Sequence, residues 1–301
     1  MSLRLRRSEL STPGSSEKMM IKAAASDADL VFLDLEDSVA PAEKPQARNL
    51  IVEALRGLDW GKKTRAVRVN AAETVYAYED VITVVEGAGE YIDLLILPKI
   101  KAPRDIWFFE TLLEQLEGKL GLGKKIGLEV LIEEAEALAC VEEIARCSPR
   151  LQALILGVGD LSASLGMKLG GIGAVDERYP GDVWQFARSR LVVAARAAGI
   201  DAIDGPYANF RNSEGYLREA ARAAILGYVG KWAIHPSQIE LANRVYSPTD
   251  EEIANAREMI EAYERAEAAG QGAASVGGVM IDAATARIFQ VIIDRADLMA
   301  E

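Results

Sequence analysis

The stretch Leu30-Val-Phe-Leu-Asp-Leu-Glu-Asp37 is a short apolar run that ends in three carboxylates. Further apolar runs also end in a charged residue or a histidine, and these are Arg68, Lys99, Glu133, Asp160, Asp204 and His235. A (β/α)8 barrel arranges its catalytic groups in this way, at the carboxyl ends of successive buried strands, because the loops there are free to vary. The sequence therefore predicts an enzyme built on an α/β TIM barrel.

The alternation of strand-like and helix-like segments supports this fold. Strands are expected at residues 8–12, 30–35, 64–69, 93–98, 126–132, 153–158, 200–204 and 229–234. Helices are expected at residues 16–26, 42–56, 74–87, 104–117, 134–146, 182–198 and 212–226, with a short one after Pro236. Such alternation is typical of parallel strands joined by helical crossovers. A doubly wound sheet is the alternative, but Thr12-Pro-Gly14 stands where its glycine fingerprint would follow the first strand.

The chain continues beyond the last predicted strand, so we expect a barrel over residues 1–246 and a helical arm over residues 247–301. Thr249 and Glu252 have the spacing of a capping box and predict a helix that runs to about Ala269. The small residues of 270–278 predict a hinge, with a last helix near Asp282. Because the segments that follow are apolar, we expect this extension to pack on a neighbouring subunit.

Composition limits the classes of function. Half of the 301 residues are apolar, which suffices for one large core and an extension. The formal net charge of −12 argues against a nucleic-acid partner. No run reaches the roughly 18–20 apolar residues that a membrane span needs. Cys140 and Cys147 lack the spacing of a metal or redox pair, so we expect free thiols and a cytoplasmic protein.

Glu133 and Asp160 are the candidate metal ligands. Each follows a predicted strand, so both carboxylates are expected at the same mouth of the barrel. Mg²⁺ is commonly held by one or two carboxylates together with waters and substrate oxygens. From position alone, a salt bridge or a helix cap explains these two residues equally well.

Arg68 is the candidate cation at this mouth. It ends a predicted strand, and its planar guanidinium suits a carboxylate or an enolate oxygen. An ion pair with Glu36 or Asp37 is the structural alternative, and both roles hold if the acidic pair fixes the guanidinium. Asp34 adds a third carboxylate, so a cation from Arg68 or Lys99 is expected among the three.

Other ionisable residues have both a functional and a structural interpretation. Lys44 and Arg48 are four apart on a predicted helix, downstream of Arg7, and indicate either a site for a phosphorylated ligand or a solvated face. His235 is the only histidine, and its place before a proline favours a structural role over proton transfer. Asp282 is either an N-cap or a proton donor that the arm carries to an active site.

Several segments, taken in chain order, resemble one family. They are Leu33-Asp-Leu-Glu-Asp-Ser-Val-Ala-Pro41, Arg68-Val-Asn70, Leu97-Pro-Lys99, Ile132-Glu133, Gly159-Asp160, Ile203-Asp-Gly-Pro206 and Gly230-Lys-Trp-Ala-Ile-His-Pro236. They resemble the CitE-like acyl-CoA lyases of the HpcH/HpaI aldolase superfamily over about Arg7 to Asp282. Two segments make the chain most similar to the malyl-CoA and β-methylmalyl-CoA lyases, Gly157-Val-Gly-Asp-Leu-Ser-Ala-Ser164 and the insertion Tyr179-Pro-Gly-Asp-Val-Trp184.

The resemblance implies roles for the residues at the barrel mouth. Glu133 and Asp160 match the ligands of Mg²⁺, for which Mn²⁺ is an expected substitute. Arg68 matches the arginine that holds the keto acid and the developing oxyanion, and Glu36 and Asp37 match the acidic pair that supports the site.

The resemblance also implies partners for the chain. Asp282 matches an acid/base that a neighbouring subunit inserts, so a homotrimer or homohexamer is expected. Lys44, Arg48 and Arg7 match surfaces that meet the phosphates of coenzyme A. A CoA thioester and a small 2-oxo acid are the expected ligands, with neither nucleic acid nor membrane as a partner.

The activity that the resemblance implies is a reversible, Mg²⁺-dependent retro-aldol cleavage. (S)-malyl-CoA would give acetyl-CoA and glyoxylate, and β-methylmalyl-CoA would give propionyl-CoA and glyoxylate. Three alternatives stay open at this stage: a citramalyl-CoA lyase that releases pyruvate, a malyl-CoA thioesterase, and a catalytically silent subunit that binds acyl-CoA. Glyoxylate and pyruvate differ by one methyl group, which a pocket distinguishes by only about 1–3 kcal/mol.

Overall fold

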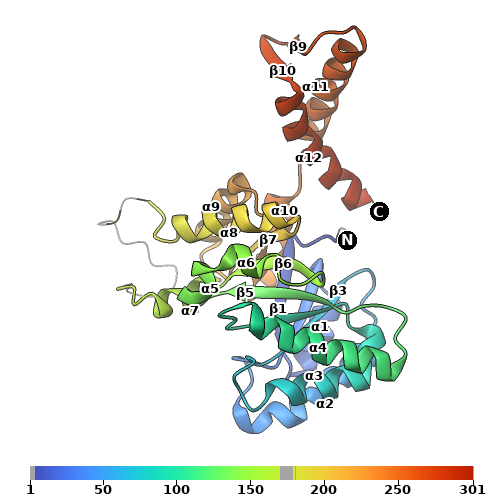
Figure 1. Cartoon of the computed structure of the whole chain (residues 1–301), viewed down its shortest axis with the longest axis vertical. Helices are drawn as coiled ribbons and strands as arrows, with labels where there is room; N and C mark the ends of the chain where they lie inside the picture. The colour runs from blue at the N-terminus through green and yellow to red at the C-terminus, as the bar shows by residue number, and fades with distance from the viewer. Residues whose placement is uncertain (1–3, 170–178, 180, 301) are drawn as a thin grey trace. The chain divides into compact units, whose positions relative to one another are not determined.

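The computed structural model describes residues 4–169, 179 and 181–300. Within these ranges eight parallel strands form a closed barrel in chain order, as predicted (Figure 1). The strands are β1 (Ser8–Pro13), β2 (Leu30–Asp34), β3 (Thr64–Arg68), β4 (Leu94–Leu97), β5 (Gly127–Ile132), β6 (Leu151–Leu156), β7 (Asp201–Asp204) and β8 (Gly230–Ala233). Each strand lies close to its predicted range, because the apolar run locates a barrel strand and the polar residue that follows the run locates its carboxyl end.

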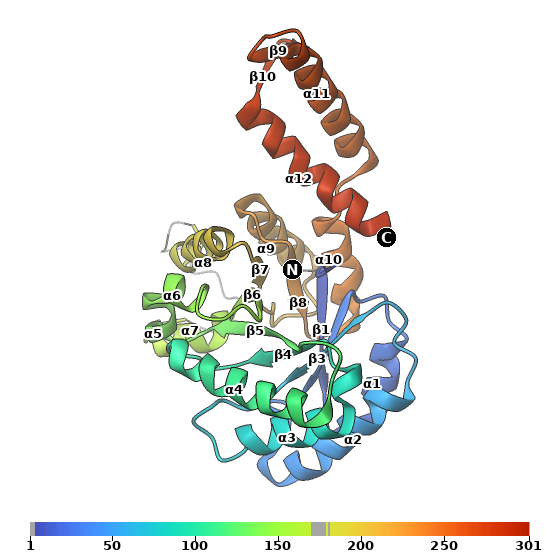
Figure 2. The ribbon, with the colours of Figure 1, turned by 45° about the vertical axis from the view of Figure 1, so that its right-hand side comes forward.

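Helices lie outside the strands and connect them (Figure 2). They are α1 (Glu17–Ala24), α2 (Lys44–Gly57), α3 (Ala77–Ala88), α4 (Pro103–Leu120), α5 (Ala135–Ala139), α6 (Val141–Ile144), α7 (Val158–Ser164), α8 (Gln185–Ala198), α9 (Ser213–Leu226) and α10 (Ile239–Tyr246). Short 3-10 helices are η1 (Pro41–Glu43), η2 (Gly89–Tyr91) and η3 (Pro236–Gln238). The single helix predicted over 134–146 is wrong, because Cys140 leaves helical geometry with φ −123° and ψ 28° and separates α5 from α6.

Apolar side chains from β2 to β8 fill the barrel. The buried cluster comprises Leu30, Phe32, Ala66, Leu94, Ile96, Leu131, Ala153, Ile155, Ile203 and Trp232. The strand register then sets the polar residues at the carboxyl ends. Asp34, the last residue of β2, is the register partner of Arg68, the last residue of β3. Two neighbouring strands therefore deliver a carboxylate and a guanidinium to the same level of the barrel mouth.

The C-terminal segment contains α11 (Asp250–Ala268), β9 (Ala273–Val276), β10 (Val279–Asp282) and α12 (Ala283–Ala300). The predicted capping box is present, since the Thr249 side chain accepts from the Glu252 amide and Glu252 accepts from the Thr249 amide. The predicted hinge over 270–278 is wrong. β9 and β10 pair antiparallel around Gly277 and Gly278, whose φ values of 57° and 84° fit a two-residue hairpin turn.

The described chain separates into two compact units, Arg6–Asn243 and a second that comprises the residues before Arg6 and those from Arg244 onward. Residues 1–3, residue 301 and Pro180 of the predicted insertion lie outside the described residues. Both cysteines are free thiols, as predicted. In the described part of the chain, no helix combines the length and the apolar character that crossing a bilayer would require. The packing of the extension on a neighbouring subunit stays a prediction.

Candidate active site

Arg68 is held by two carboxylates, one at the end of the adjacent strand β2 and one in the loop that follows it. Its Nε and Nη2 donate to the two oxygens of Asp34 at 2.7 and 2.6 Å, and its Nη1 lies 3.0 Å from Glu36 Oε2. Asp34 also accepts from the amides of Glu36 and Ser38, so it shapes the loop after β2. Although burial raises the pKa of Asp34, Arg68 outweighs it and the pKa is lowered. Asp34 therefore stays an anion that fixes the guanidinium.

Two aromatic rings support the same guanidinium. The Arg68 Cζ lies 5.5 Å from the centroid of the Trp232 ring and 5.9 Å from that of Phe32. Those two rings are themselves in contact, with centroids 4.4 Å apart. The Trp232 Nε1 donates to Glu9 Oε2 at 2.9 Å inside the barrel. Carboxylates therefore bind the N–H edge of the Arg68 guanidinium, and aromatic rings lie against its face. Together they restrict the orientation of the guanidinium plane.

Lys99 connects the acidic residues of the mouth. It follows β4, and its Nζ forms an ion pair with Glu36 Oε1 and lies 3.3 Å from Asp37 Oδ1. The prediction that Arg68 or Lys99 neutralises the acidic cluster is therefore confirmed for both cations. Burial raises the pKa of Glu36, and the negative charge of Asp37 raises it further against the opposing effects of Arg68 and Lys99.

Glu133 occupies the centre of the mouth. Its Oε1 accepts from the Lys99 amide at 2.8 Å, and Gly157 packs against it so closely that a Cβ at residue 157 would lie 2.6 Å from Oε2. Burial, together with the negative charges of Asp160 and Glu36, raises the pKa of Glu133 to about 8. Asp160 lies in the first turn of α7 and is half-buried. The two predicted metal ligands thus repel each other electrostatically across the mouth.

This donor set fits a hard cation. Among the described residues, no group of three or more His, Cys, Asp or Glu side chains is arranged as a complete metal site. A pair of carboxylates is what Mg²⁺ takes from a protein when waters and substrate oxygens complete its shell. A cation between Glu133 and Asp160 would counteract the burial and the charge repulsion that together raise the Glu133 pKa. Gly157 leaves room beside the Glu133 carboxylate that any larger residue would fill.

The prediction that Lys44 and Arg48 form an exposed basic cluster on α2 is wrong. Lys44 is buried, and its Nζ donates to the carbonyl oxygens of Leu35 and Glu36 at 2.6 and 2.8 Å. Arg48 is also buried, with its Nε 2.7 Å from Asp80 Oδ1. Lys44 is satisfied by carbonyl oxygens of the loop after β2, and Arg48 by the acidic residues Glu79 and Asp80 of α3. Neither side chain presents a free charge to the phosphates of a cofactor.

Arg7 lies at the opposite end of the barrel. It precedes β1, and its Nη2 is 2.7 Å from Asp29 Oδ1, a residue that precedes β2. The carboxyl ends of the strands, where Glu133 and Arg68 lie, are therefore remote from it along the strand direction. The predicted contact between Arg7 and CoA phosphates has no support from this geometry.

His235 and Asp282 both cap helices. His235 is exposed, its Nδ1 accepts from the Ser237 amide at 3.2 Å, and its ring stacks on Phe210. The structural interpretation of His235 is thus the one the geometry supports. Asp282 Oδ1 accepts from the Thr285 amide at 2.8 Å at the start of α12, and this hydrogen bond lowers the Asp282 pKa. Asp282 belongs to the C-terminal unit, whose contacts with a barrel stay a prediction.

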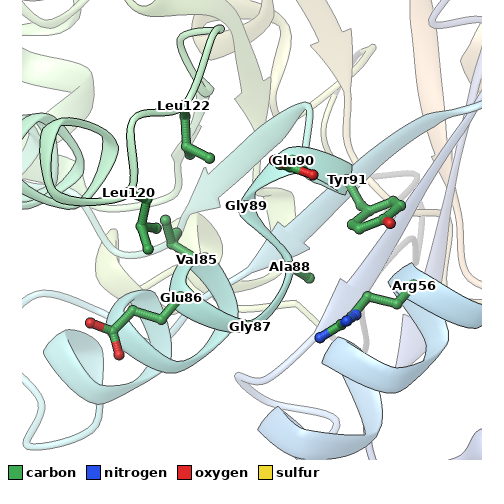
Figure 3. Close-up of a pocket in the computed structure, with 10 residues that line it drawn as sticks. All are labelled: Arg56, Val85, Glu86, Gly87, Ala88, Gly89, Glu90, Tyr91, Leu120 and Leu122. Atoms are coloured by element: carbon green, nitrogen blue, oxygen red, sulfur yellow. The ribbon is translucent and has the colours of Figure 1, made fainter.

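A separate pocket lies away from these residues. It has a volume of about 240 Å³ and is lined by side chains that include Arg56, Glu86, Glu90 and Tyr91 (Figure 3). Its η2 residues lead into β4 from the amino end of that strand. The pocket is therefore on the end of the barrel opposite the candidate active site and takes no part in it.

Sequence reasoning missed part of the site. Trp232 gives no signal beyond its place in an apolar run, and its ring lies near Arg68 only because the strands close into a barrel in which β8 pairs with β1. Lys99 is predicted only as a counter-charge, yet its amide also holds Glu133. Asp34 is predicted as one of three crowded carboxylates, and only the register of β2 on β3 selects it as the bidentate partner.

The chain matches known proteins along nearly its whole length. The sequence profile of HpcH/HpaI aldolase/citrate lyase matches residues 7–236. The chain belongs to the HpcH/HpaI aldolase/citrate lyase family. It is 44% identical to the L-malyl-CoA/beta-methylmalyl-CoA lyase of Rhodobacter capsulatus, over 98% of this chain and 96% of that protein. The family predicted from the mouth residues is confirmed.

Solved structures of this family have the same fold. A citrate lyase from Burkholderia xenovorans has a TM-score of 0.88 at 23% identity and covers 100% of this chain and 94% of its own, a likeness of fold. Protein CitE from Mycobacterium tuberculosis, solved in complex with magnesium, acetoacetate and coenzyme A, has a TM-score of 0.76 at 30% identity. That match covers 96% of this chain and 97% of the CitE chain.

Proposed function

We propose that this lyase cleaves (S)-malyl-CoA reversibly to acetyl-CoA and glyoxylate in a Mg²⁺-dependent reaction, and β-methylmalyl-CoA to propionyl-CoA and glyoxylate. The observation that carries the proposal is the connected cluster of Arg68, Glu36, Lys99 and Glu133 at the barrel mouth. The relative from Rhodobacter capsulatus is named for these two substrates and is 44% identical, which supports their choice over citramalyl-CoA.

Glu133 and Asp160 would hold the cation. Mg²⁺ bound there supplies a Lewis acid for the oxygen that changes from hydroxyl to carbonyl. The similar protein CitE was solved in complex with magnesium, which supports Mg²⁺ as the cation. Mn²⁺ would serve as a substitute because it accepts the same carboxylate and water ligands.

Arg68 would hold the 2-oxo acid. A guanidinium has five N–H hydrogens, of which Asp34 takes two and Glu36 one in this structure. The remaining hydrogens are free to bind the carboxylate of malyl-CoA or glyoxylate, in the bidentate manner that arginine favours. The fixed plane of Arg68 would orient that carboxylate, with Glu36 and Asp37 supporting it from the loop after β2.

The cleavage breaks one carbon–carbon bond. The hydroxyl of malyl-CoA loses its proton, the bond between the carbinol carbon and the methylene carbon breaks, and glyoxylate leaves as the carbonyl product. The electron pair of that bond forms the enolate of the acetyl thioester, which fixed cations stabilise as it develops. A proton added to the methylene carbon gives acetyl-CoA, so the protons balance and no redox partner is needed.

Asp282 would handle the proton on carbon. In the condensation direction a carboxylate is required to remove a proton from acetyl-CoA, and the lowered pKa of Asp282 keeps it ionised. We infer that a neighbouring subunit supplies Asp282 within a homotrimer or homohexamer, and that the protein acts in the cytoplasm. The exposed apolar residues Val279, Met280 and Ile288 of the C-terminal unit support an arm that packs on another chain.

The proposal is tested by mixing acetyl-CoA and glyoxylate with the purified protein, in Mg²⁺ and in EDTA. We expect malyl-CoA to form only with Mg²⁺. Parallel reactions with propionyl-CoA, and with pyruvate in place of glyoxylate, define the substrate range. Condensation with pyruvate and none with glyoxylate would identify a citramalyl-CoA lyase, and no product from any pair would refute the proposed activity.

A further inference from the structure

Lys99 has an unusual backbone conformation at the centre of the site. Its φ is 51°, and among the described residues it is the only one other than glycine with a positive φ. Side chains with a Cβ rarely adopt this left-handed region, because the Cβ crowds the neighbouring carbonyl oxygen. Such a conformation persists only where the surroundings enforce it, and it is frequent at functional sites.

The left-handed turn gives the Lys99 amide a specific partner. Lys99 follows β4 by two residues, and its N–H donates to Glu133 Oε1 at 2.8 Å. On the other side of the same carboxylate, a Cβ at Gly157 would lie 2.6 Å from Oε2. Glu133 is thus held by an amide on one oxygen, while no side chain from residue 157 occupies the place beside the other oxygen.

The side chain of Lys99 serves a second set of carboxylates. Its Nζ contacts Glu36 and Asp37 on the loop after β2, while its backbone contacts Glu133 after β5. One residue therefore contacts both the acidic pair Glu36 and Asp37 and the carboxylate assigned to the cation. The backbone and the ammonium do different tasks, so substitutions can separate them.

We propose that Lys99 is a positioning residue whose left-handed backbone fixes Glu133 Oε1 through its amide and thereby leaves Oε2 oriented for the cation. The proposal rests on the proposed function, in which Glu133 is a ligand of Mg²⁺. A group that orients a metal ligand in this way typically changes metal affinity 10–100-fold when it is lost.

A pair of neutral variants isolates the backbone. Lys99→Gly and Lys99→Val both remove the ammonium and so alter the charge of the mouth equally. Glycine adopts the left-handed region freely, whereas a β-branched valine strongly disfavours it. Titration of the metal-free full-length variants with MgCl₂ in a calorimeter gives the Kd of each. We expect Lys99→Val to bind Mg²⁺ at least about tenfold more weakly than Lys99→Gly. Equal Kd values for two folded variants would overturn the proposal.

A control and a second measurement complete the test. Lys101→Val removes a nearby lysine whose Nζ pairs with the exposed Glu73, and it should leave the Kd for Mg²⁺ unchanged. If Lys99→Val fails to fold, the hydrogen-exchange rate of the Lys99 amide tests the proposal instead. The Lys99 amide should exchange at least about tenfold faster in Glu133→Ala than in the wild type, because its acceptor is gone. Unchanged exchange would refute the amide–carboxylate contact.

Failure of this inference is separable from failure of the proposed function. Wild-type protein that neither binds Mg²⁺ nor condenses acetyl-CoA with glyoxylate would refute the function itself. Wild-type protein that does both, alongside Lys99→Gly and Lys99→Val variants of equal affinity, would refute only the role of the Lys99 backbone.

Discussion

The guanidinium of Arg68 contacts two carboxylates and two aromatic rings. Lysine at this position keeps the charge but has a single nitrogen, which cannot reach Asp34 and Glu36 in a planar fork. We therefore expect Arg68→Lys to lower kcat/KM for malyl-CoA cleavage by about 10²–10³-fold, the range found when a donor to a developing oxyanion is lost. Steady-state kinetics with malyl-CoA measures this.

Arg65→Lys is the matched control for Arg68→Lys. Arg65 is the second residue of the same strand and pairs with Asp93 at the amino end of the barrel. We expect its kinetics to equal those of the wild type. An Arg68→Lys variant within about threefold of wild-type kcat/KM would contradict the role of the guanidinium.

Glu9 is fully buried below Trp232, and burial raises its pKa to about 7. Because the folded-state pKa exceeds the unfolded value, the folded protein binds the extra proton between about pH 4.5 and pH 7. The stabilising effect of that proton is lost as the pH rises through this window. Glu9→Gln removes the titration, so it should gain stability over the wild type by roughly 3 kcal/mol at pH 8 and by little at pH 5.

Urea denaturation at the two pH values measures this difference. Glu90→Gln, at an exposed glutamate, serves as the control and should show no change with pH relative to the wild type. A Glu9→Gln variant that is less stable than the wild type at pH 8 would show that the carboxylate is ionised and satisfied in the folded barrel. Glu133 titrates in both proteins, so it cancels in the comparison.

At the scale of elements, β8 and β1 close the barrel through a glycine. Gly230 begins β8, and a Cβ there would overlap the carbonyl oxygen of Arg6, next to the start of β1. Since backbone on both sides cannot move without breaking the strand pairing, Gly230→Ala should destabilise the barrel by about 2–4 kcal/mol or prevent folding. Thermal unfolding measures the loss.

Gly118→Ala provides the comparison for Gly230→Ala. Gly118 lies within α4, and a Cβ there meets nothing within 4 Å. Alanine favours a helix over glycine, so this variant should be as stable as the wild type or up to about 1 kcal/mol more stable. If Gly230→Ala unfolds at the same temperature as the wild type, the close approach between residue 230 and the carbonyl oxygen of Arg6 is wrong.

The elements that the sequence predicts well are those with a local signal. Apolar runs followed by a charged residue or a histidine mark seven of the eight strands, because a barrel strand is mostly apolar until it reaches the mouth, whereas β1 ends in Thr12 and Pro13. The β9–β10 hairpin was not predictable from size and composition alone, although Gly277-Gly278 is a pair that suits its turn. Lys44 and Arg48 have the spacing of an exposed face, and only the fold reveals the carbonyls and Asp80 that bury them.

At the scale of the whole molecule, the proposed active site is divided between the barrel of one subunit and the arm of another. Glu133→Gln and Asp282→Asn should each lose at least about 100-fold in activity. Asparagine retains the capacity to cap α12, so the arm keeps its local structure. Coexpressed in equal amounts, the two variants should recover about a quarter of wild-type activity through random pairing of intact barrels and intact arms.

Assays of the coexpressed pair against each variant alone measure this recovery. Complementation requires that Asp282 and Glu133 of one site come from different chains. A mixture no more active than the single variants would place both residues of a site on one chain. The sequence identifies Glu133 and Asp282 as candidates for this test. It does not predict how the subunits assemble, because assembly depends on surfaces that form only in the folded protein.

The most direct test of the account is the release of glyoxylate from malyl-CoA by the wild type and by Glu133→Gln over a titration of Mg²⁺. We predict that wild-type protein releases glyoxylate and acetyl-CoA in equal amounts, that EDTA stops the reaction, and that Glu133→Gln is at least about 100-fold slower at every Mg²⁺ concentration. Glyoxylate release that is indifferent to EDTA and to the Glu133 substitution, or release of malate and free CoA instead, would contradict the account.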